Sequence, residues 1–181
     1  PGTRIDSVML DGDKNNYLMS AYLSDDGKAG VSWTDISTGE FQNLLIDSQL
    51  NLKLNEILSR VSPAEIICNS KMKVRSNQLS LVRYGGIYKF SQYSDDAFSY
   101  DNAFEKVKAV LKNFSMFDGK PECVCSAGAL LDYIEKTQKR TLKHIKSGEF
   151  DDAEQYMTID ANARRTLELM SSSGGKTSGS L

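Results

Sequence analysis

The 181-residue sequence has only three cysteines and one histidine, and it has no long apolar run. Three cysteines form no paired disulfide framework, so we expect a reducing, cytoplasmic setting. No stretch approaches the ~18 apolar residues that a membrane span requires. Residues 1–6 lack the apolar core of a signal peptide. They also lack a starting methionine, and we therefore expect the chain to be a fragment of a longer protein.

The sequence also lacks an excess of basic over acidic residues. Lysine and arginine number 22 and aspartate and glutamate 24, which gives a net charge of -2. Because nucleic-acid-binding modules usually carry a clear basic excess, we expect at most weak, salt-sensitive binding of DNA phosphates. Hydrophobic residues make up 40% of the chain, which is enough for a packed core.

The hydrophobic pattern predicts three strands joined by two tight turns, followed by alternating helices and strands. Asp-Gly and Thr-Gly mark the turns, and glycine tolerates a positive φ there. Asp47 or Ser48 is expected to cap the first helix, and Asn102 with Glu105 resembles a capping box. The predicted strands are 16–24, 29–36, 41–47, 65–68 and 87–93, and the predicted helices are 50–61, 72–83, 102–115, 126–145 and 161–170.

This order predicts an α/β fold. Three antiparallel strands followed by two right-handed crossover units are typical of the ribonuclease-H-like arrangement. We therefore expect a mixed five-stranded sheet with flanking helices, followed by a mainly helical partial segment of a second domain. A flavodoxin-like fold would need a helix after the first strand, and none fits there.

The expected fold raises the hypothesis of a metal-dependent nuclease. Such enzymes hold two metal ions with carboxylates, one of them in the middle of the first strand, because divalent ions require hard oxygen ligands. Residues 16–24 contain no acidic residue, and the fourth strand runs into Cys68-Asn69-Ser70. Asp35 and Glu56 are too few to build the site, and we expect Asp35 to support a turn. No catalytic or metal-ligating residue is therefore expected, and the nuclease is the alternative hypothesis.

Two other patterns resemble ligand sites but lack the residue spacing or flanking secondary structure that such sites need. The sequence spacing of Cys68, Cys123, Cys125 and His144 suits a zinc site poorly. We expect the cysteines to pack as small apolar side chains. Gly174–Thr177 resembles the end of a phosphate loop, but no apolar strand precedes it and no helical stripe follows. We expect no cofactor-binding residue.

Two groups of charged residues are candidate contact sites. The helix that starts near Asn102 is expected to bury Phe104, Val107, Leu111 and Phe114. It would then turn Glu105, Lys106, Lys108 and Lys112 outward, either as an ordinary solvated face or as a surface for a partner. Arg164 and Arg165 in the last predicted helix are either a solvated or salt-bridged pair or a contact to DNA phosphates.

Motifs in nearly the whole chain match one family, in that family's order. They are Pro1-Gly2-Thr3, 15–18, 35–41, 63–66, 127–133 with Thr137-Gln138, 157–160 and 164–169. On these residues the chain resembles the bacterial MutS family of mismatch-recognition proteins. It departs from the family at Thr166, where asparagine is usual.

The resemblance implies a fragment with three parts. Residues 1–14 would be a linker from a mismatch-binding domain, and 15–146 a ribonuclease-H-like connector domain. Residues 147–181 would begin the core or lever domain. The Ser/Gly/Lys-rich composition of 171–181 predicts a disordered tail. The fragment would be non-catalytic and would link mismatch sensing to the ATPase. ATP and Mg²⁺ would belong to the full-length protein, and no cofactor to this fragment.

The resemblance also implies partners. MutL would bind the connector, for which Glu105, Lys106, Lys108 and Lys112 form the candidate surface. Mismatched duplex DNA would bind through the full-length protein, with Arg164 and Arg165 as candidate phosphate contacts. The connector would contact other MutS domains, and the full-length protein would be a homodimer without a membrane segment.

Overall fold

The computed structural model describes residues 17–79, 81–83, 86–137 and 145–151. The predicted linker 1–14, the predicted helix 161–170 and the tail 171–181 lie outside the described residues, as do His144 and the Arg164-Arg165 pair.

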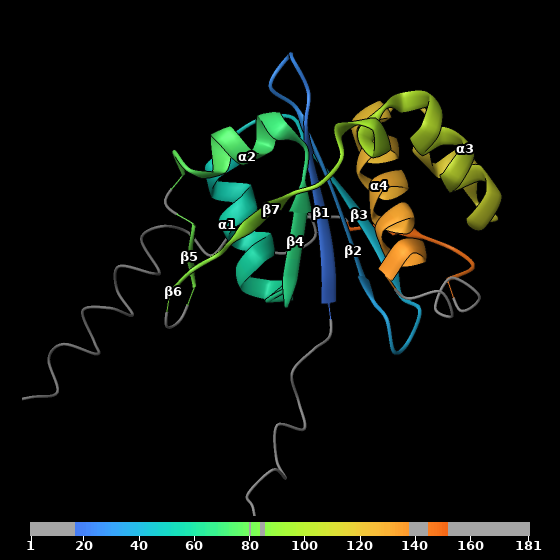
Figure 1. The fold of residues 1–181 in the computed structure, drawn as a ribbon, viewed down its shortest axis with the longest axis horizontal. Coiled ribbons are helices and arrows are strands. Elements are labelled where there is room, and N and C mark those ends of the chain that lie inside the picture. The colour runs from blue at the N-terminus through green and yellow to red at the C-terminus, as the bar shows by residue number, and fades with distance from the viewer. Residues whose placement is uncertain (1–16, 80, 84–85, 138–144, 152–181) are drawn as a thin grey trace, which may run out of the picture. The chain divides into compact units, whose positions relative to one another are not determined.

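A six-stranded mixed sheet forms the centre of the described fold (Figure 1). The strands β1 (Tyr17–Leu23), β2 (Ala29–Asp35) and β3 (Phe41–Ile46) form an antiparallel meander. Three shorter strands pair in parallel: β4 (Glu65–Cys68) with β1, β7 (Phe90–Gln92) with β4, and β8 (Glu149–Phe150) with β3. The order across the sheet is β7-β4-β1-β2-β3-β8. The predicted ribonuclease-H-like α/β fold is confirmed, with six strands instead of five because the chain returns to the sheet edge after residue 146.

The two hairpin turns follow the local sequence. Gly27 and Gly39 have φ values of 86° and 77°, which glycine adopts at little steric cost. One carboxylate oxygen of Asp35 accepts hydrogen bonds from the Ser37 amide at 2.8 Å and the Ser37 hydroxyl at 2.6 Å. The predicted role of Asp35 in this turn is confirmed.

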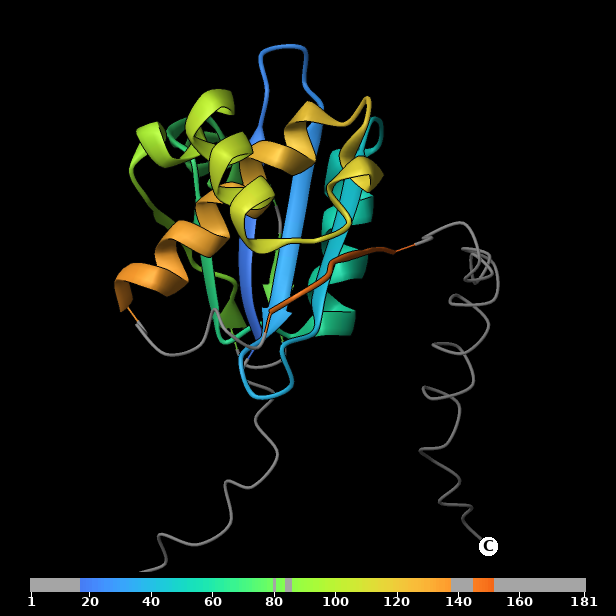
Figure 2. The same cartoon turned by 90° about the vertical axis from the view of Figure 1, so that its right-hand side faces the viewer.

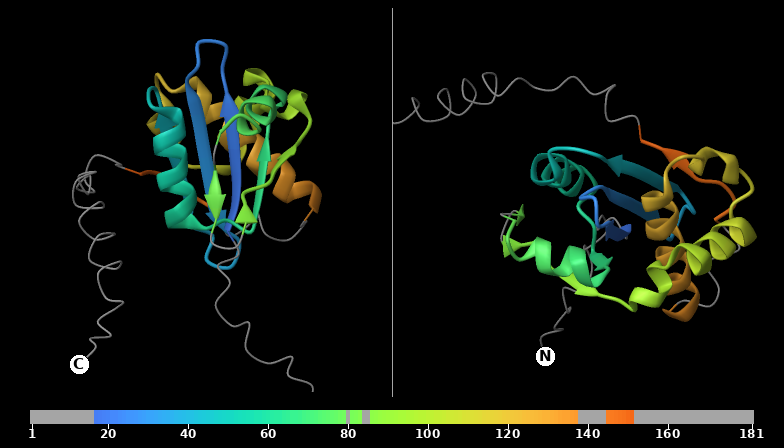
Figure 3. Two further views of the ribbon diagram at one scale, coloured as in Figure 1. Left: turned by 90° about the vertical axis from the view of Figure 1, so that its left-hand side faces the viewer. Right: turned by 90° about the horizontal axis from the view of Figure 1, so that it is seen from above.

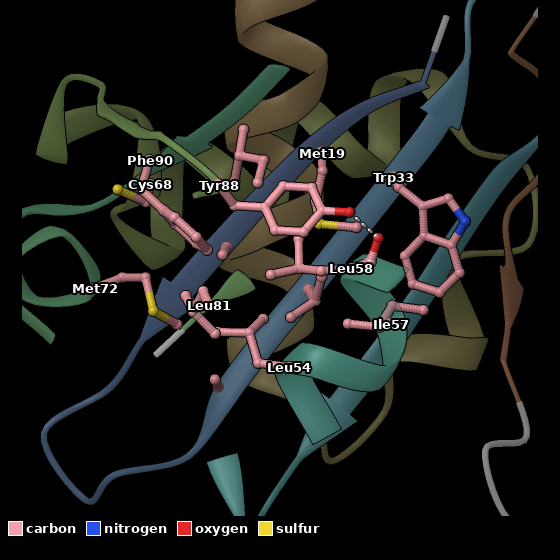
Figure 4. Packing of buried hydrophobic residues seen from close by; sticks show 14 of the residues in the cluster. Met19, Trp33, Leu54, Ile57, Leu58, Cys68, Met72, Leu81, Tyr88 and Phe90 are labelled. Carbon is pink, nitrogen blue, oxygen red and sulfur yellow. Dashed lines mark hydrogen bonds between the residues drawn. The ribbon is translucent and has the colours of Figure 1, made fainter. Parts of the chain in front are cut away.

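Two helices, α1 (Leu50–Val61) and α2 (Ser70–Ser76), cover one face of the sheet (Figures 1 and 3). The helix α1 buries the predicted stripe of Leu54, Ile57, Leu58 and Val61. These side chains pack against Met19 and Trp33 of the sheet in one apolar cluster (Figure 4). The Tyr88 hydroxyl donates a hydrogen bond to the Leu58 carbonyl at 2.7 Å, so its polar end is satisfied within the cluster.

The predicted start of α1 at Leu50 is confirmed, but the residues predicted to cap it were wrong, and the predicted start of α2 at residue 72 was also wrong. Gln49, and not Asp47 or Ser48, is the N-cap of α1, with φ 52° and no side-chain cap. The Oδ1 atom of Asp47 instead lies 3.3 Å from Lys53 Nζ. Asn69 caps α2, since its side chain accepts from the Met72 amide at 3.1 Å, and the helix therefore begins directly after β4.

The predicted helix 72–83 is also too long, because α2 ends at Ser76. Leu81 is 1% exposed and its carbonyl accepts a hydrogen bond from the Tyr88 amide at 3.2 Å. Because Leu81 and Tyr88 are both buried in the core and hydrogen-bonded to each other, the segment between them does not continue the helix. A short hairpin of β5 (Val82–Arg83) and β6 (Gly86–Ile87) lies between them, and the strand predicted at 87–93 is reduced to β7.

The opposite face of the sheet carries α4 (Pro121–Thr137), and α3 (Tyr100–Val110) packs against α4 (Figures 1 and 2). Short 3-10 helices, η1 (Asp95–Phe98) and η2 (Phe114–Phe117), flank α3. The helix α4 begins at Pro121 instead of residue 126, because proline is well tolerated in the first helical turn. None of the described helices is long and apolar enough to cross a membrane.

The capping box predicted at Asn102 is wrong. Ser99 is the N-cap of α3, and the Asn102 side chain donates to the Asp96 carbonyl at 3.1 Å. The helix ends at Val110 and not at residue 115. Leu111 takes an extended conformation, and the following amide, that of Lys112, bonds to the Lys146 carbonyl and not to a helical one.

Candidate protein-interaction site

The helices α3 and α4 approach each other closely at one glycine. A Cβ atom on Gly128 would lie 2.3 Å from the Cα of Ala103 and 2.7 Å from its carbonyl oxygen. Real Cβ atoms essentially never come this close to other heavy atoms. Any side chain at residue 128 would therefore force the helices apart, and glycine sets the spacing between them.

A surface groove of about 430 Å³ runs between α3, α4 and η1. Small residues on the three elements, Ala97, Ala109 and Gly128, line part of it. Its other lining residues are polar or charged: Ser94, Asp96, Asn102, Glu105, Lys106, Asp132 and Lys136. A groove with both charge signs suits a polar, salt-sensitive contact better than an apolar ligand.

Ion pairs hold the charges of the groove in place. Lys106 on α3 pairs with Glu135 on α4, so this bridge also ties the two helices together. Lys136 Nζ lies 2.7 Å from an Asp132 carboxylate oxygen one turn earlier on α4. The Tyr93 hydroxyl donates to the same Asp132 oxygen at 2.8 Å.

The groove shifts the pKa of two of its groups. Burial by itself would raise the pKa of Asp132, but hydrogen bonds from Lys136 and Tyr93 outweigh burial and hold that pKa below its usual range. Burial and the hydrogen bond to Asp132 raise the pKa of Tyr93. At neutral pH, Asp132 is therefore a carboxylate and Tyr93 a neutral donor.

The structure separates the four candidate contact residues. Glu105, Lys108 and Lys112 are exposed, while Lys106 is half-buried and turned toward α4. Lys108 Nζ lies 5.7 Å from the centre of the Phe104 ring. Lys112 follows the end of α3, and its amide donates to the Lys146 carbonyl at 3.0 Å. Glu105 and Lys106 both line the groove, whereas Lys108 and Lys112 are not among its lining residues.

Sequence reasoning missed Gly128 and Asn113. Gly128 lies in the run Ala127-Gly128-Ala129, and small residues within an apolar helix are a signal of close helix packing that could have found it. Asn113 was expected within a helix. In the structure its side chain binds the backbone of Gly148, 35 residues later. No sequence pattern marks that long-range contact.

The carboxylates considered for a nuclease lie apart from a common site. Asp35 is bound into its turn, and Glu56 is exposed on α1. Of the four residue pairs between β1 and β4, one contains a carboxylate, Glu65 opposite Leu18, and Glu65 accepts a hydrogen bond from the Tyr133 hydroxyl at 2.7 Å. Across the described ranges, no three histidine, cysteine or acidic side chains gather where they could hold a metal ion.

All three cysteines are buried free thiols. Burial raises the pKa of Cys68 and of Cys123 to about 12, and that of Cys125 to about 11. They therefore stay protonated at neutral pH and behave as small apolar side chains, as predicted. His144, the fourth residue weighed for zinc, lies outside the described residues.

Comparisons with known proteins identify the family of this chain. A family model described as MutS domain II matches residues 16–146. A DNA mismatch repair protein MutS from Clostridium botulinum (strain 657 / Type Ba4) is 36% identical over 177 residues, which is 98% of this chain and 19% of that protein. The MutS of Acetivibrio thermocellus is 34% identical over 172 residues, covering 93% of this chain and 20% of that protein. The chain thus spans about a fifth of the length of these relatives. With a match over most of its length, the chain belongs to the MutS domain II family.

Proposed function

We propose that this chain is the non-catalytic connector of a MutS-like mismatch-recognition ATPase and links mismatch sensing to the ATPase. The match to MutS domain II over residues 16–146 is the observation that carries the proposal. The well-packed apolar clusters on both sides of the sheet support a scaffold role. The separation of Asp35 and Glu56 supports this role over the alternative of a nuclease, which needs converging carboxylates.

The proposal extends to the parts of the full-length protein. ATP and Mg²⁺ would bind in the ATPase domain of that protein, and mismatched duplex DNA would be held by the full-length homodimer. Arg164 and Arg165 are proposed to contact DNA phosphates. The protein would act in the cytoplasm and its connector would contact other MutS domains.

We further propose that MutL binds the surface formed by α3 and its groove with α4. The support comes from position and charge. The helix α3 packs on α4 and presents exposed Glu105 and Lys108, and Lys112 is exposed just after the end of α3. Lys106 and Glu105 place both charge signs in the groove. A mixed polar surface of this kind gives a transient contact whose association rate depends on salt.

The test measures MutL affinity by interferometry with the full-length protein that contains this chain. Glu105→Lys should weaken MutL binding about fivefold at low salt and leave mismatch affinity intact, because reversal of a charge at an interface rim acts mainly on association. Glu56→Lys reverses a comparable exposed charge on α1, on the other side of the sheet, and should have no effect on MutL binding.

Lys106 needs a second control because it also holds α3 against α4. Lys106→Glu removes the pair with Glu135, whereas the double variant Lys106→Glu/Glu135→Lys keeps an ion pair in the reverse direction. If MutL interacts with the charge of residue 106 itself, both variants should bind MutL weakly. Unchanged MutL affinity in Glu105→Lys and in the double variant, with the fold verified by circular dichroism, would move the interface elsewhere.

A further inference from the structure

We propose that residues 145–151, here called the latch, are released from the sheet edge when a protein binds in the groove between α3 and α4. Release would separate Glu149 and Phe150 from β3. This inference rests on the proposed function in one respect, since it takes MutL as the protein that binds the groove. The latch itself is defined by contacts within the described residues.

The segment that follows α3 holds the latch directly. The Lys112 amide donates to the Lys146 carbonyl at 3.0 Å. The Asn113 side chain then donates to the Gly148 carbonyl at 2.6 Å and accepts from the Gly148 amide at 3.1 Å. A single amide side chain thus satisfies both polar groups of one latch residue, as a neighbouring strand would do. Displacement of the end of α3 must break or strain these bonds.

On its other side, the latch pairs with the edge of the sheet over a short distance. The strand β8 has two residues, paired with Gln42 and Asn43 of β3, and Figure 2 shows this segment in dark orange. Asn43 binds it from both ends: its side chain donates to the Glu149 carbonyl at 3.1 Å and its carbonyl accepts from the Asp151 amide at 2.9 Å. By comparison, β1 and β2 pair over seven residues. The pairing of β8 is short, but release of the latch must also expose Ile145, which is 2% exposed, and break the ion pair between Asp151 and Arg60 of α1. The binding energy of a partner must therefore supply this cost.

A series of aromatic side chains connects the outer surface of α3 to the latch. Ring centres are 5.7 Å apart for Tyr100 and Phe104, 4.8 Å for Phe104 and Phe114, and 6.1 Å for Phe114 and Phe117. Phe117 then lies 5.5 Å from Phe150 of the latch. Tyr100 is 46% exposed, so the series begins at the surface and ends in β8. Lys120 Nζ lies 3.8 Å from the centre of the Phe150 ring and closes the series.

The direction of the coupling follows from the packing at Gly128. The two helices already touch backbone to backbone there, so α3 cannot move closer to α4. A protein segment inserted into the groove can only move α3 outward, and the end of α3 carries Lys112 and Asn113 with it. The latch is the element with two states, docked and released, and groove occupancy favours the released one.

Hydrogen–deuterium exchange on the full-length protein that contains this chain tests the proposal. The probes are the amides of Gly148 and Asp151, which are both hydrogen-bonded in the docked latch. Saturating MutL should make them exchange about five- to tenfold faster, the lower part of the usual range for coupling between two sites. The amides paired between β1 and β2 should be unchanged.

Two variants test the latch without any partner. Asn113→Ala removes both side-chain bonds to Gly148, and we expect about tenfold faster exchange at Gly148 and Asp151. Gly128→Ala should have the same direction of effect because it pushes α3 outward. Asn51→Ala, an exposed asparagine on α1, is the matched control and should leave latch exchange unchanged.

The outcomes separate the two proposals. Unchanged exchange at the latch in both Asn113→Ala and Gly128→Ala would overturn the coupling between α3 and the latch, whatever MutL does. Faster exchange in these variants, with unchanged or slower exchange when MutL binds α3, would overturn release by the partner. If Glu105→Lys has no effect on MutL binding, the proposed interface fails, and with it the identity of the partner.

Discussion

Replacement of Gly128 by alanine is the sharpest test of the packing between α3 and α4. Helix propensity alone predicts that this change stabilises the protein, because alanine is favoured over glycine in a helix interior by about 1 kcal/mol. The new methyl group, however, would lie 2.3 Å, 2.5 Å and 2.7 Å from the Cα, Cβ and carbonyl oxygen of Ala103. Two of these atoms belong to the backbone and cannot rotate away.

The clash outweighs the propensity gain. To restore an ordinary contact of 3.4 Å or more from 2.3 Å, α3 must move by about 1 Å, which opens gaps around the buried Val107 and Ala103. Overpacking of a core typically costs about 1–3 kcal/mol, and a clash with backbone lies at or above the upper end. After the gain of about 1 kcal/mol in propensity, we expect a net loss of about 2 kcal/mol.

Thermal unfolding of the 181-residue chain, followed by circular dichroism, measures this loss. The midpoint should fall by about 6 °C, at roughly 3 °C per kcal/mol for a domain of this size. The double variant Ala103→Gly/Gly128→Ala should remain destabilised, because the Cα and carbonyl oxygen of residue 103 stay in place. Ala109→Gly, on the exposed side of α3, calibrates the propensity effect at about 1 kcal/mol. A midpoint that stays the same or rises in Gly128→Ala would refute the reasoning.

Two further predictions concern thiols and pH. In the folded protein the three cysteines should resist a thiol reagent at pH 8, because burial keeps their pKa values at about 11 to 12. They should react once the protein is unfolded in denaturant. Rapid modification of the native chain would contradict this prediction. Asp132→Asn should lower stability at pH 7 by at most about 1 kcal/mol, since it weakens the contacts to Lys136 and Tyr93. Because the folded state lowers the pKa of Asp132, its stabilisation is present above the ordinary value of 3.8 and is lost as the pH falls further. The difference in unfolding free energy between the parent protein and Asp132→Asn should therefore shrink below that pH, as measured by denaturation curves at several pH values. A difference that stays constant would argue against the lowered pKa of Asp132.

The parts of the fold that could be predicted depend on local signals. Asp-Gly at 26–27 and Thr-Gly at 38–39 predicted both hairpin turns, because glycine alone takes a positive φ at little cost. The stripe from Leu54 to Val61 predicted α1, because its spacing places one apolar face on the sheet. Helix ends were less predictable. Gln49 caps α1 without a side-chain bond, and α3 ends before Leu111, where the next amide bonds to Lys146, a residue far along the chain.

For the candidate site, the sequence placed Glu105, Lys106 and Lys108 correctly on α3, but it placed Lys112 there wrongly and did not predict which of these residues are paired. Lys106 turns toward Glu135, 29 residues later, and a pairing between two helices depends on how the helices pack. The motifs from Pro1 to Leu169 were enough to indicate the family, because such motifs are defined by residue types and their order along the chain. The thiols of Cys68, Cys123 and Cys125 were correctly expected to be buried apolar groups.

The sequence by itself therefore determined the order of the main strands and helices from β1 to α4, without the β5–β6 hairpin and β8, together with the turns, the apolar faces and the family. Each of these depends on residues close together in the chain, or on a pattern that can be read along it. Only the tertiary structure decided the contact of Gly128 with Ala103, the groove beside it and the attachment of β8 through Asn113 and Asn43. Those features join residues that are 25 to 106 positions apart, and their energies come from packing distances and hydrogen bonds that exist only once the chain has folded.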